Sequence, residues 1–535
     1  MLTSLRFSGI LFILASLTHA SSLASEVDIS LITQTSELEE KYKQNTAKID
    51  SMSIPMSIQE AVQTGLMNNP LLEKSYREIQ AQEWDKVSVM RGWIPTLNVN
   101  GYPAYSQQVA TNQTRYIHPS PKPELSVSSS SSMQAGNSQN DGSGNQNIQS
   151  SSSSTVSASA GRENPQTFYS NQMAITPQST FQWTFFDLQR GSNIAASQSK
   201  INSQKLLFDS SARVLILNIA TQYYNLQATL DLLGKFQNVL DMSKRALIAI
   251  NAQRRAGIKD IGDVAQMSTQ YFQSLNRLIS TQDNLIDYSS KLAKSLGFSS
   301  DALIIPNTPL KQLPPWTLTL DESIDLGSKN NELIYAAFEN SKSNEFTALG
   351  YKQSYIPSLF LYAIGYMSRN NGLNNALVNR QGASNSNMIN TSFNAQYGIG
   401  FTWSFDGGVN FALANSYIKR SEASLADSQS KKDQVVQNIK SSFGTYKTKE
   451  LAVQSSSRGL FAAELSQKVA ASKYEFGLSD ITTLVQSLQL YTSAAEANVN
   501  AIRDYNQSIA SLYRWSAIWP ENTEQILSKR EELLK

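Results

Sequence analysis

The chain has 535 residues, and its 45 basic and 43 acidic side chains leave a net charge of only +2. A nucleic-acid-binding protein normally carries a basic face, so this balance argues against nucleic acid as a partner. The sequence contains no cysteine and only two histidines, His19 and His118. These counts exclude disulfides and thiol nucleophiles and disfavour metal or triad enzymes. We therefore expect no enzyme activity and no catalytic, cofactor-binding or metal-binding residues.

Residues 1–24 have the pattern of a secretory signal peptide. Arg6 supplies the positive start, residues 9–17 form the apolar stretch, and small residues follow at the expected cleavage site. A membrane anchor is the alternative, but the apolar run is shorter than the roughly 20 residues that a spanning helix needs. No other segment is long and apolar enough, so we expect any membrane insertion to occur through strands closed into a barrel.

The rest of the sequence contains one pattern twice. The Ile-Pro-x-Leu junction at Pro95 recurs at Pro357, an offset of 262 residues, and the Phe-x-Trp segment at Phe181 recurs at Phe401, an offset of 220. The offsets differ by 42 residues, which indicates an insertion in the first copy. The inserted region includes a Ser-rich stretch at about 120–165. Such a composition buries little apolar surface, so we expect a long flexible loop there.

This duplication predicts the domain organisation. We expect a signal peptide (1–24), an N-terminal periplasmic segment (25–56), a first repeat (57–300), a linker (301–318), a second repeat (319–519) and a C-terminal tail (520–535). The first repeat should contain a helix at 57–91, strands at about 97–107 and 172–186, a long helix at 190–255 and a helix at 261–296. The second should contain a helix at 319–353, strands at about 358–368 and 392–405, a long helix at 409–474 and a helix at 481–516. Short charged helices are expected at 36–49 and 523–534.

The strand before each long helix alternates apolar and polar residues. The aromatic positions are Phe181, Trp183 and Phe185 in the first repeat and Phe401, Trp403 and Phe405 in the second, and the residues between them are polar but uncharged. Because successive side chains of a strand point to opposite faces, one face would contact lipid and the other a wet lumen. A soluble β-sandwich shows the same alternation and is the alternative. Four strands cannot close a barrel, so the membrane interpretation requires an oligomer, and three copies would supply twelve strands.

The helical segments carry apolar residues at alternating spacings of three and four, which is the coiled-coil signal. At 1.5 Å per residue the helix at 190–255 would be about 100 Å long, as long as the two shorter helices of its repeat placed end to end. Gly257 and Gly477 lie at the turns between the long helices and the helices that follow, where a left-handed backbone is needed to reverse the chain. A periplasmic coiled-coil adaptor without a barrel is the alternative for these helices.

Together these features resemble the outer-membrane efflux proteins of the TolC type, the outer membrane factors. The likeness rests on the duplicated order of elements, the Asn-Asn-Pro start at residues 68–70, the two Ile-Pro-x-Leu junctions, the helix entry at Gly407-Gly408 and the tip glycines Gly257 and Gly477. It implies a mixed α and β membrane protein with four β-strands per protomer. In a homotrimer these strands would form a 12-stranded outer-membrane β-barrel, continued by a long α-helical coiled-coil barrel in the periplasm.

The resemblance also implies a function. Such a channel exports substrates, either small molecules such as drugs or secreted proteins, from the periplasm or cytoplasm to the exterior. It is the exit duct of a tripartite efflux or type I secretion system. Its partners would be other copies of itself, a periplasmic adaptor, an inner-membrane transporter of the RND, ABC or MFS type, and outer-membrane lipid. The sequence does not predict the cargo.

The resemblance assigns two groups of site residues to the tips of the long helices. Tyr474 and Asp263 match positions of the network that closes the tunnel, whereas Ser479, Thr483 and Gln486 replace an arginine and two aspartates that are expected there. Adaptor docking is expected at the tip turns, over residues 255–264 and 476–484, with the residues Gly257, Ile261, Val264, Gly477, Ile481 and Leu484.

Overall fold

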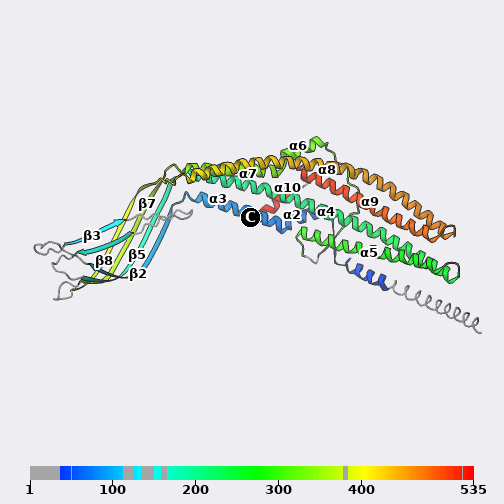
Figure 1. Ribbon diagram of the computed structural model, residues 1–535, viewed down its shortest axis with the longest axis horizontal. Helices are drawn as coiled ribbons and strands as arrows, with labels where there is room; N and C mark the ends of the chain where they lie inside the picture. Colours follow the sequence, from blue (N-terminus) through cyan, green and yellow to red (C-terminus); the bar gives the residue numbers. More distant parts are fainter. Residues whose placement is uncertain are drawn as a thin grey trace, which may run out of the picture. The chain divides into compact units, whose positions relative to one another are not determined.

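The computed structural model describes residues 37–49, 51–112, 126–133, 150–157, 166–299, 302–376, 384–520 and 522–534. The predicted signal peptide at residues 1–24 lies outside these ranges. The described residues form two compact units (Figure 1). The helical unit contains the described residues up to 90, 188–355 and those from 405 onward, and the strand unit contains those within 91–187 and 356–404.

Each repeat supplies one long helix and its partners to the helical unit. The first repeat provides α2 (Ile58–Asn68), α3 (Pro70–Arg91), α4 (Leu188–Arg255) and α5 (Ile261–Leu296). The second provides α6 (Leu320–Asn330), α7 (Glu332–Gln353), α8 (Val409–Glu475) and α9 (Ile481–Trp515), and α10 (Thr523–Leu534) follows. Residues 37–49 are also helical. Helix α4 lies beside α5, and α8 lies beside α9 (Figure 1). These pairs are called hairpin one and hairpin two.

The helices expected at 57–91 and 319–353 are each broken in two, so the prediction of continuous helices was wrong. The breaks lie at Asn69 and Asn331, whose backbones are extended with ψ angles of 123° and 124°. Each asparagine side-chain oxygen accepts a hydrogen bond from the backbone N–H two residues later, which starts the next helix. In the first repeat Pro70 adds a second cause, because a proline disfavours the helical conformation in the residue before it.

A short parallel strand pair lies where the sequence indicated no strand. Strand β1 (Ser53–Met56), in the N-terminal segment, pairs with β6 (Leu303–Pro306), in the predicted linker. The hydroxyl of Ser289 on α5 accepts a hydrogen bond from the N–H of Ile304 (2.6 Å) and donates one to its carbonyl (3.0 Å). These contacts attach both connecting segments to the first repeat.

The strand unit is built on one antiparallel four-stranded sheet. Its strands are β2 (Thr96–Asn112), β5 (Gln166–Phe186), β7 (Ser358–Ala376) and β8 (Ser384–Thr402), in the order β2-β5-β7-β8. The pairing of β5 with β7 joins the two repeats. The strands are longer than predicted, with 17, 21, 19 and 19 residues, and β8 ends three residues before the expected position 405.

Part of the Ser-rich stretch at 120–165 is not the loop that its composition indicated. Within it, β3 (Ser126–Met133) pairs in antiparallel fashion with β4 (Ser150–Ser157), and Val127 lies opposite Val156. Strand pairing uses backbone N–H and C=O groups, so it satisfies them without an apolar side-chain core. Apolar burial, on which the prediction of a loop rested, is therefore not needed for this strand pair.

Two glycines of β8 make room for aromatic rings of β7. Phe360 lies directly opposite Gly400, and Tyr362 lies opposite Gly398. A β-carbon at Gly400 would lie 2.5 Å from the ring of Phe360, and one at Gly398 would lie 3.2 Å from the Tyr362 hydroxyl oxygen. The amide of Gln396 also donates a hydrogen bond to that hydroxyl (3.2 Å). The glycines therefore let the rings cover the neighbouring strand.

Replacing Gly400 by alanine should destabilise the sheet, because the new methyl group would overlap the Phe360 ring. Overpacking of this kind costs about 1–3 kcal/mol. The matched control is Gly365→Ala in β7, where a β-carbon meets no atom within 4 Å. Unfolding of the two purified variants by denaturant would be compared, and an equal loss of stability in both would contradict this packing argument.

Candidate functional site

The two hairpins end in turns of the same geometry. Gly257 and Gly477 have φ angles of +72° and +71°, in the left-handed region that favours glycine. At each tip the glycine N–H bonds to the carbonyl three residues earlier, and the next residue bonds to the carbonyl five residues earlier. This is the Schellman arrangement that ends a helix. Asp260 and Asp480 then cap the helices that follow, α5 and α9. The tips therefore hold their side chains on a fixed backbone.

Asp263 and Tyr474, predicted to form a closing contact, lie near each other but take other partners within the chain. The Tyr474 hydroxyl donates a hydrogen bond to the side-chain oxygen of Gln253 (3.4 Å), and Asp263 forms an ion pair with Lys259 (3.7 Å). The Lys259 ammonium lies 5.9 Å from the centre of the Tyr474 ring. Burial and the nearby Asp263 carboxylate raise the pKa of Tyr474, so its phenol stays protonated at neutral pH.

The other three predicted gate residues occupy the start of α9. The backbone N–H and the hydroxyl of Thr483 both donate hydrogen bonds to one carboxylate oxygen of Asp480, at 2.9 and 2.6 Å. These hydrogen bonds lower the pKa of Asp480, so the cap remains ionised. Ser479 is half-buried in the turn, and Gln486 is exposed one turn further along the helix. The Thr483 side chain therefore helps to cap the helix.

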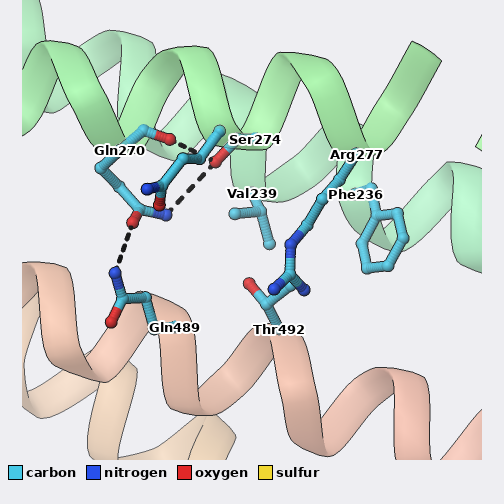
Figure 2. A pocket seen from close by; sticks show the side chains of 8 residues that line it. Phe236, Val239, Gln270, Ser274, Arg277, Gln489 and Thr492 are labelled. Atoms are coloured by element: carbon cyan, nitrogen blue, oxygen red, sulfur yellow. Dashed lines mark hydrogen bonds between the residues drawn. The ribbon is translucent and has the colours of Figure 1, made fainter. Parts of the chain in front are cut away.

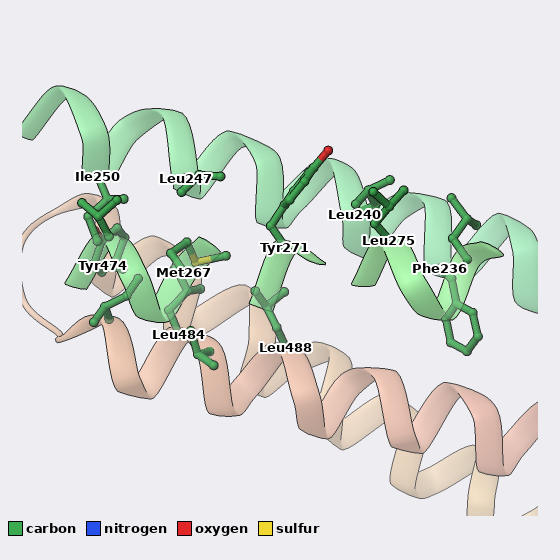
Figure 3. Packing of buried hydrophobic residues seen from close by; sticks show 14 residues of the cluster. Phe236, Leu240, Leu247, Ile250, Met267, Tyr271, Leu275, Tyr474, Leu484 and Leu488 are labelled. Atoms are coloured by element: carbon green, nitrogen blue, oxygen red, sulfur yellow. The ribbon is translucent and has the colours of Figure 1, made fainter. Parts of the chain in front are cut away.

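The six residues predicted for docking do not form one exposed surface. Val264, Ile481 and Leu484 have exposed fractions of only 5, 2 and 4%, because their positions face the opposite hairpin. Figure 3 shows Leu484 beside Met267 in this cluster, with Tyr474 and Ile250 near the tips. The tip glycines and Ile261 are exposed.

The exposed apolar residues at the tips lie within the predicted docking ranges, although the prediction did not name them individually. Ile258, Phe476 and Leu478 have exposed fractions of 71, 77 and 76%. Each is adjacent to a tip glycine, at the turn between two helices. An apolar residue next to a turn glycine was the signal that could have identified them individually.

The aromatic face of the sheet is largely exposed within the protomer. Of the six predicted lipid-facing residues, Phe181, Trp183, Phe401, Trp403 and Phe405 are exposed, whereas Phe185 is half-buried. The Trp183 indole donates a hydrogen bond to the carbonyl of Trp93 (2.9 Å). Trp403 and Phe405 follow the last residue of β8, so they lie outside the strand, and Phe405 belongs to the helical unit.

A small polar gap lies between the hairpins. It is lined by Gln270, Ser274 and Arg277 of α5, by Gln489 and Thr492 of α9, and by parts of α4 (Figure 2). Its volume of about 20 Å³ is enough for one water molecule. The Gln489 amide donates a hydrogen bond to the side-chain oxygen of Gln270 (3.2 Å), and the Gln270 amide donates one to Ser274 (3.3 Å). The hydrogen bond between Gln489 and Gln270 joins α9 to α5, and the gap beside it is too small to hold a substrate.

No helix among the described residues combines the length and the apolar character that crossing a membrane requires. No group of three or more His, Cys, Asp or Glu side chains among these residues is arranged to hold a metal ion.

Comparison with known proteins identifies relatives of this chain. No family model matches the sequence. The Outer membrane protein TolC of Escherichia coli is 22% identical over 364 residues, which cover 66% of this chain and 71% of TolC. The predicted resemblance to TolC-type proteins is thereby confirmed.

Solved structures share the fold. The CmeC outer membrane channel of Campylobacter jejuni matches with a TM-score of 0.64 and 14% identity, over 89% of each chain. The outer membrane protein VceC of Vibrio cholerae matches with a TM-score of 0.59 and 13% identity, over 86% of this chain and 95% of VceC. The combination of a small sheet with long helical hairpins is therefore one already seen in outer-membrane channels.

Proposed function

We propose that this chain is an outer-membrane channel that exports substrates from the periplasm or cytoplasm to the exterior. It acts as the exit duct of a tripartite efflux or type I secretion system, as a conduit without catalytic chemistry. The observation that carries the proposal is the presence, in one chain, of a sheet with an exposed aromatic face and two long helical hairpins. Helix α4 alone has 68 residues, which corresponds to about 100 Å. The fold shared with outer-membrane channels supports the same role.

The sheet supplies the membrane-inserted part in this proposal. Phe181, Trp183 and Phe401 face lipid in this proposal, whereas Gln178, Thr180 and Gln182 of β5 point to the opposite face and line a wet lumen. Phe360 and Tyr362 of β7 lie on that second face too, because they pair with Thr184 and Gln182. The long hairpins extend into the periplasm, where a periplasmic adaptor and an inner-membrane transporter of the RND, ABC or MFS type complete the assembly. A periplasmic coiled-coil protein without a barrel is the alternative, but it gives no role to the exposed aromatic face.

The open edges of the sheet support the proposed homotrimer. Among the described strands, β2 and β8 each pair on one side only. Unpaired backbone groups are costly in lipid, so these edges require partners from other copies. Three copies, each with four strands, form the proposed 12-stranded barrel.

The long helices carry apolar surface that a trimer would bury. Phe461, Leu465 and Val469 recur every four residues along one face of α8, with exposed fractions of 72, 56 and 45%. Ile248 of α4 and Ile279 of α5 are also exposed. A stripe of this kind on a helix normally packs against another helix. We assign it to the contact between protomers.

The mature protein should be recovered from outer-membrane fractions in detergent as a trimer, measured by native mass. Phe461→Asp should shift this mass toward the monomer, because it would bury a charge in the contact between protomers. Ser466→Asp, at an exposed position on another face of α8, is the control that should leave the trimer intact. A soluble monomer or dimer of the parent protein would instead support the periplasmic alternative.

The tips of the hairpins are the proposed docking surface for the adaptor. The surface consists of the exposed residues Ile258, Ile261, Phe476 and Leu478, held around Gly257 and Gly477. Val264, Ile481 and Leu484 support it from the core beneath. Exposed apolar side chains on a rigid turn provide the anchors that protein contacts commonly use.

The variant with Ile258→Asp and Leu478→Asp should lose export while its trimer yield stays unchanged. The substitutions place charges on the proposed contact but touch no core residue. Leu71→Asp, at a residue 74% exposed on α3, serves as the control away from the tips. Dye retention would be measured in cells that lack their own channel and carry the variant. Normal export by the tip variant would exclude these residues from docking.

We propose further that Tyr474 and Asp263 help to close the periplasmic end. The hydrogen bond from Tyr474 to Gln253 connects the end of α8 to the end of α4 and so restrains the two tips relative to each other. The Asp263–Lys259 ion pair lies within hairpin one and holds the Lys259 ammonium 5.9 Å from the centre of the Tyr474 ring. Ser479, Thr483 and Gln486 contribute no carboxylate to the opening. The entrance therefore lacks the negative charge that the family resemblance would place at Thr483 and Gln486, and the positive charge that it would place at Ser479.

Removing the two contacts should raise the resting conductance of the channel in planar bilayers. The variant combines Tyr474→Phe, which deletes only the hydroxyl, with Asp263→Ala, which frees Lys259. We expect an increase of several-fold, whereas Glu475→Gln, at an exposed neighbouring residue, should conduct as the parent does. An unchanged conductance in the double variant would remove these residues from the gate.

A further inference from the structure

The helical segment at residues 37–49 docks through a regular stripe of side chains. Only Glu39, Tyr42, Thr46 and Ile49 are partly buried, and every other residue of the segment is exposed. Their spacings of three, four and three place them on one face of a helix. A helix with one buried stripe and an otherwise exposed surface is held by this stripe alone.

Each residue of the stripe contacts the first repeat. Tyr42 packs against the apolar cluster that contains Tyr271 and Leu275, and Ile49 packs against the cluster that contains Leu285. The side-chain amide of Gln282 donates a hydrogen bond to the Thr46 hydroxyl (3.0 Å). The segment therefore lies along α5 and runs in the same direction as that helix.

Glu39 makes the strongest polar contact of the segment. One carboxylate oxygen accepts a hydrogen bond from the Tyr271 hydroxyl, and the other accepts one from the Lys244 ammonium, each at 2.5 Å. Tyr271 is 1% exposed, and the Glu39 side chain is 13% exposed. Charge-assisted hydrogen bonds of this kind are about twice as strong as neutral ones. Glu39 thus connects α4 and α5 to the segment at a single point.

The charges around Glu39 keep it ionised. Burial alone would raise the pKa of Glu39, but the hydrogen bonds from Lys244 and Tyr271 and the positive charges of Lys244 and Lys43 lower it below its ordinary value of 4.5. Because docking lowers the pKa of Glu39, the ionised carboxylate stabilises the docked state above pH 4.5. This stabilisation is lost as the pH falls through the pKa that Glu39 has in the docked state. Burial and the Glu39 carboxylate raise the pKa of Tyr271, so its hydroxyl remains a donor at neutral pH.

Hairpin two cannot receive the same segment. The repeat offset of 220 residues places Tyr491 at the position of Tyr271, but it places Glu464 at the position of Lys244. Glu464 is itself paired with Lys468 at 2.8 Å. A carboxylate in the position of Glu39 would there face another carboxylate, so charge restricts docking to hairpin one.

We propose that residues 37–49 form a releasable strap on hairpin one, with Glu39 as the latch that selects this hairpin and opens on acidification. The docked strap covers the Tyr271 hydroxyl. It fixes the chain that leads into β1 against α4 and α5, next to Lys244 and Tyr271. Hairpin two carries no equivalent among the described residues. The duplicated hairpins are thereby made unequal.

The strap can be followed by cross-linking, because the chain contains no cysteine. Thr46→Cys and Gln282→Cys would be introduced together into the full-length mature protein, and a short reagent that links two thiols would be added. In this background, Glu39→Gln should slow cross-linking by about tenfold at pH 7.5, because it replaces the charged latch by a neutral group. Glu40→Gln is the matched control, at the exposed neighbouring residue, and should react as the parent does.

Two further arms test the charge and the pH dependence. Glu39→Lys should block cross-linking, and combining it with Lys244→Glu should restore it, since the pair is then reversed. Cross-linking of the parent protein, normalised to the reactivity of single-cysteine variants, should fall as the pH drops below 4.5, whereas the Glu39→Gln variant should show no such fall. Equal cross-linking of the parent and Glu39→Gln at pH 7.5, or failure of the reversed pair to recover, would overturn the proposal.

Discussion

One buried carboxylate links the two repeats in the helical unit, between α4, α7 and α9. Glu332, at the start of α7, forms ion pairs with Arg213 of α4 and with Arg514 of α9. All three side chains are at most 6% exposed. Arg213 also stacks on the ring of Trp519, and Arg514 donates a hydrogen bond to Ser210. Breaking such a cluster leaves buried charges without compensation, so the positions of α4 and α9 relative to α7 depend on it.

The two repeats share one framework but differ in the segments that pack against them. The framework is repeated: each repeat has a capping box at its first helix, a break at an asparagine, a hairpin turn at a glycine and an aspartate cap. The segments that pack on this framework from outside the repeats are not duplicated among the described residues. Residues 37–49 cover only hairpin one, and Arg530 of α10 donates hydrogen bonds to the carbonyls of Leu66 and Asn69 at the end of α2. Similar hairpins thereby acquire different surroundings.

The tips illustrate how far the sequence could predict the candidate site. The repeated glycines located both turns, because a left-handed backbone there is a local requirement. The distribution of apolar side chains was predicted less well. Val264, Ile481 and Leu484 are buried since the opposite hairpin covers them, and the exposure of Ile258 and Leu478 depends on how the turn presents them. The partners of Tyr474 and Asp263 likewise depend on which residues of α4 lie nearby.

The sequence by itself determined the features that local residue patterns, and their repetition along the chain, can predict. These are the duplication, the three- and four-residue spacing of the helices, the alternation of Phe401 and Trp403 with polar residues, and the glycine turns. Only the tertiary structure decided which distant segments meet. The parallel pairing of β1 with β6, the sheet order β2-β5-β7-β8 and the docking of Glu39 between Lys244 and Tyr271 are of this kind. The physical reason is that backbone pairing and buried charge contacts depend on distances in space, which a local pattern of residues does not encode.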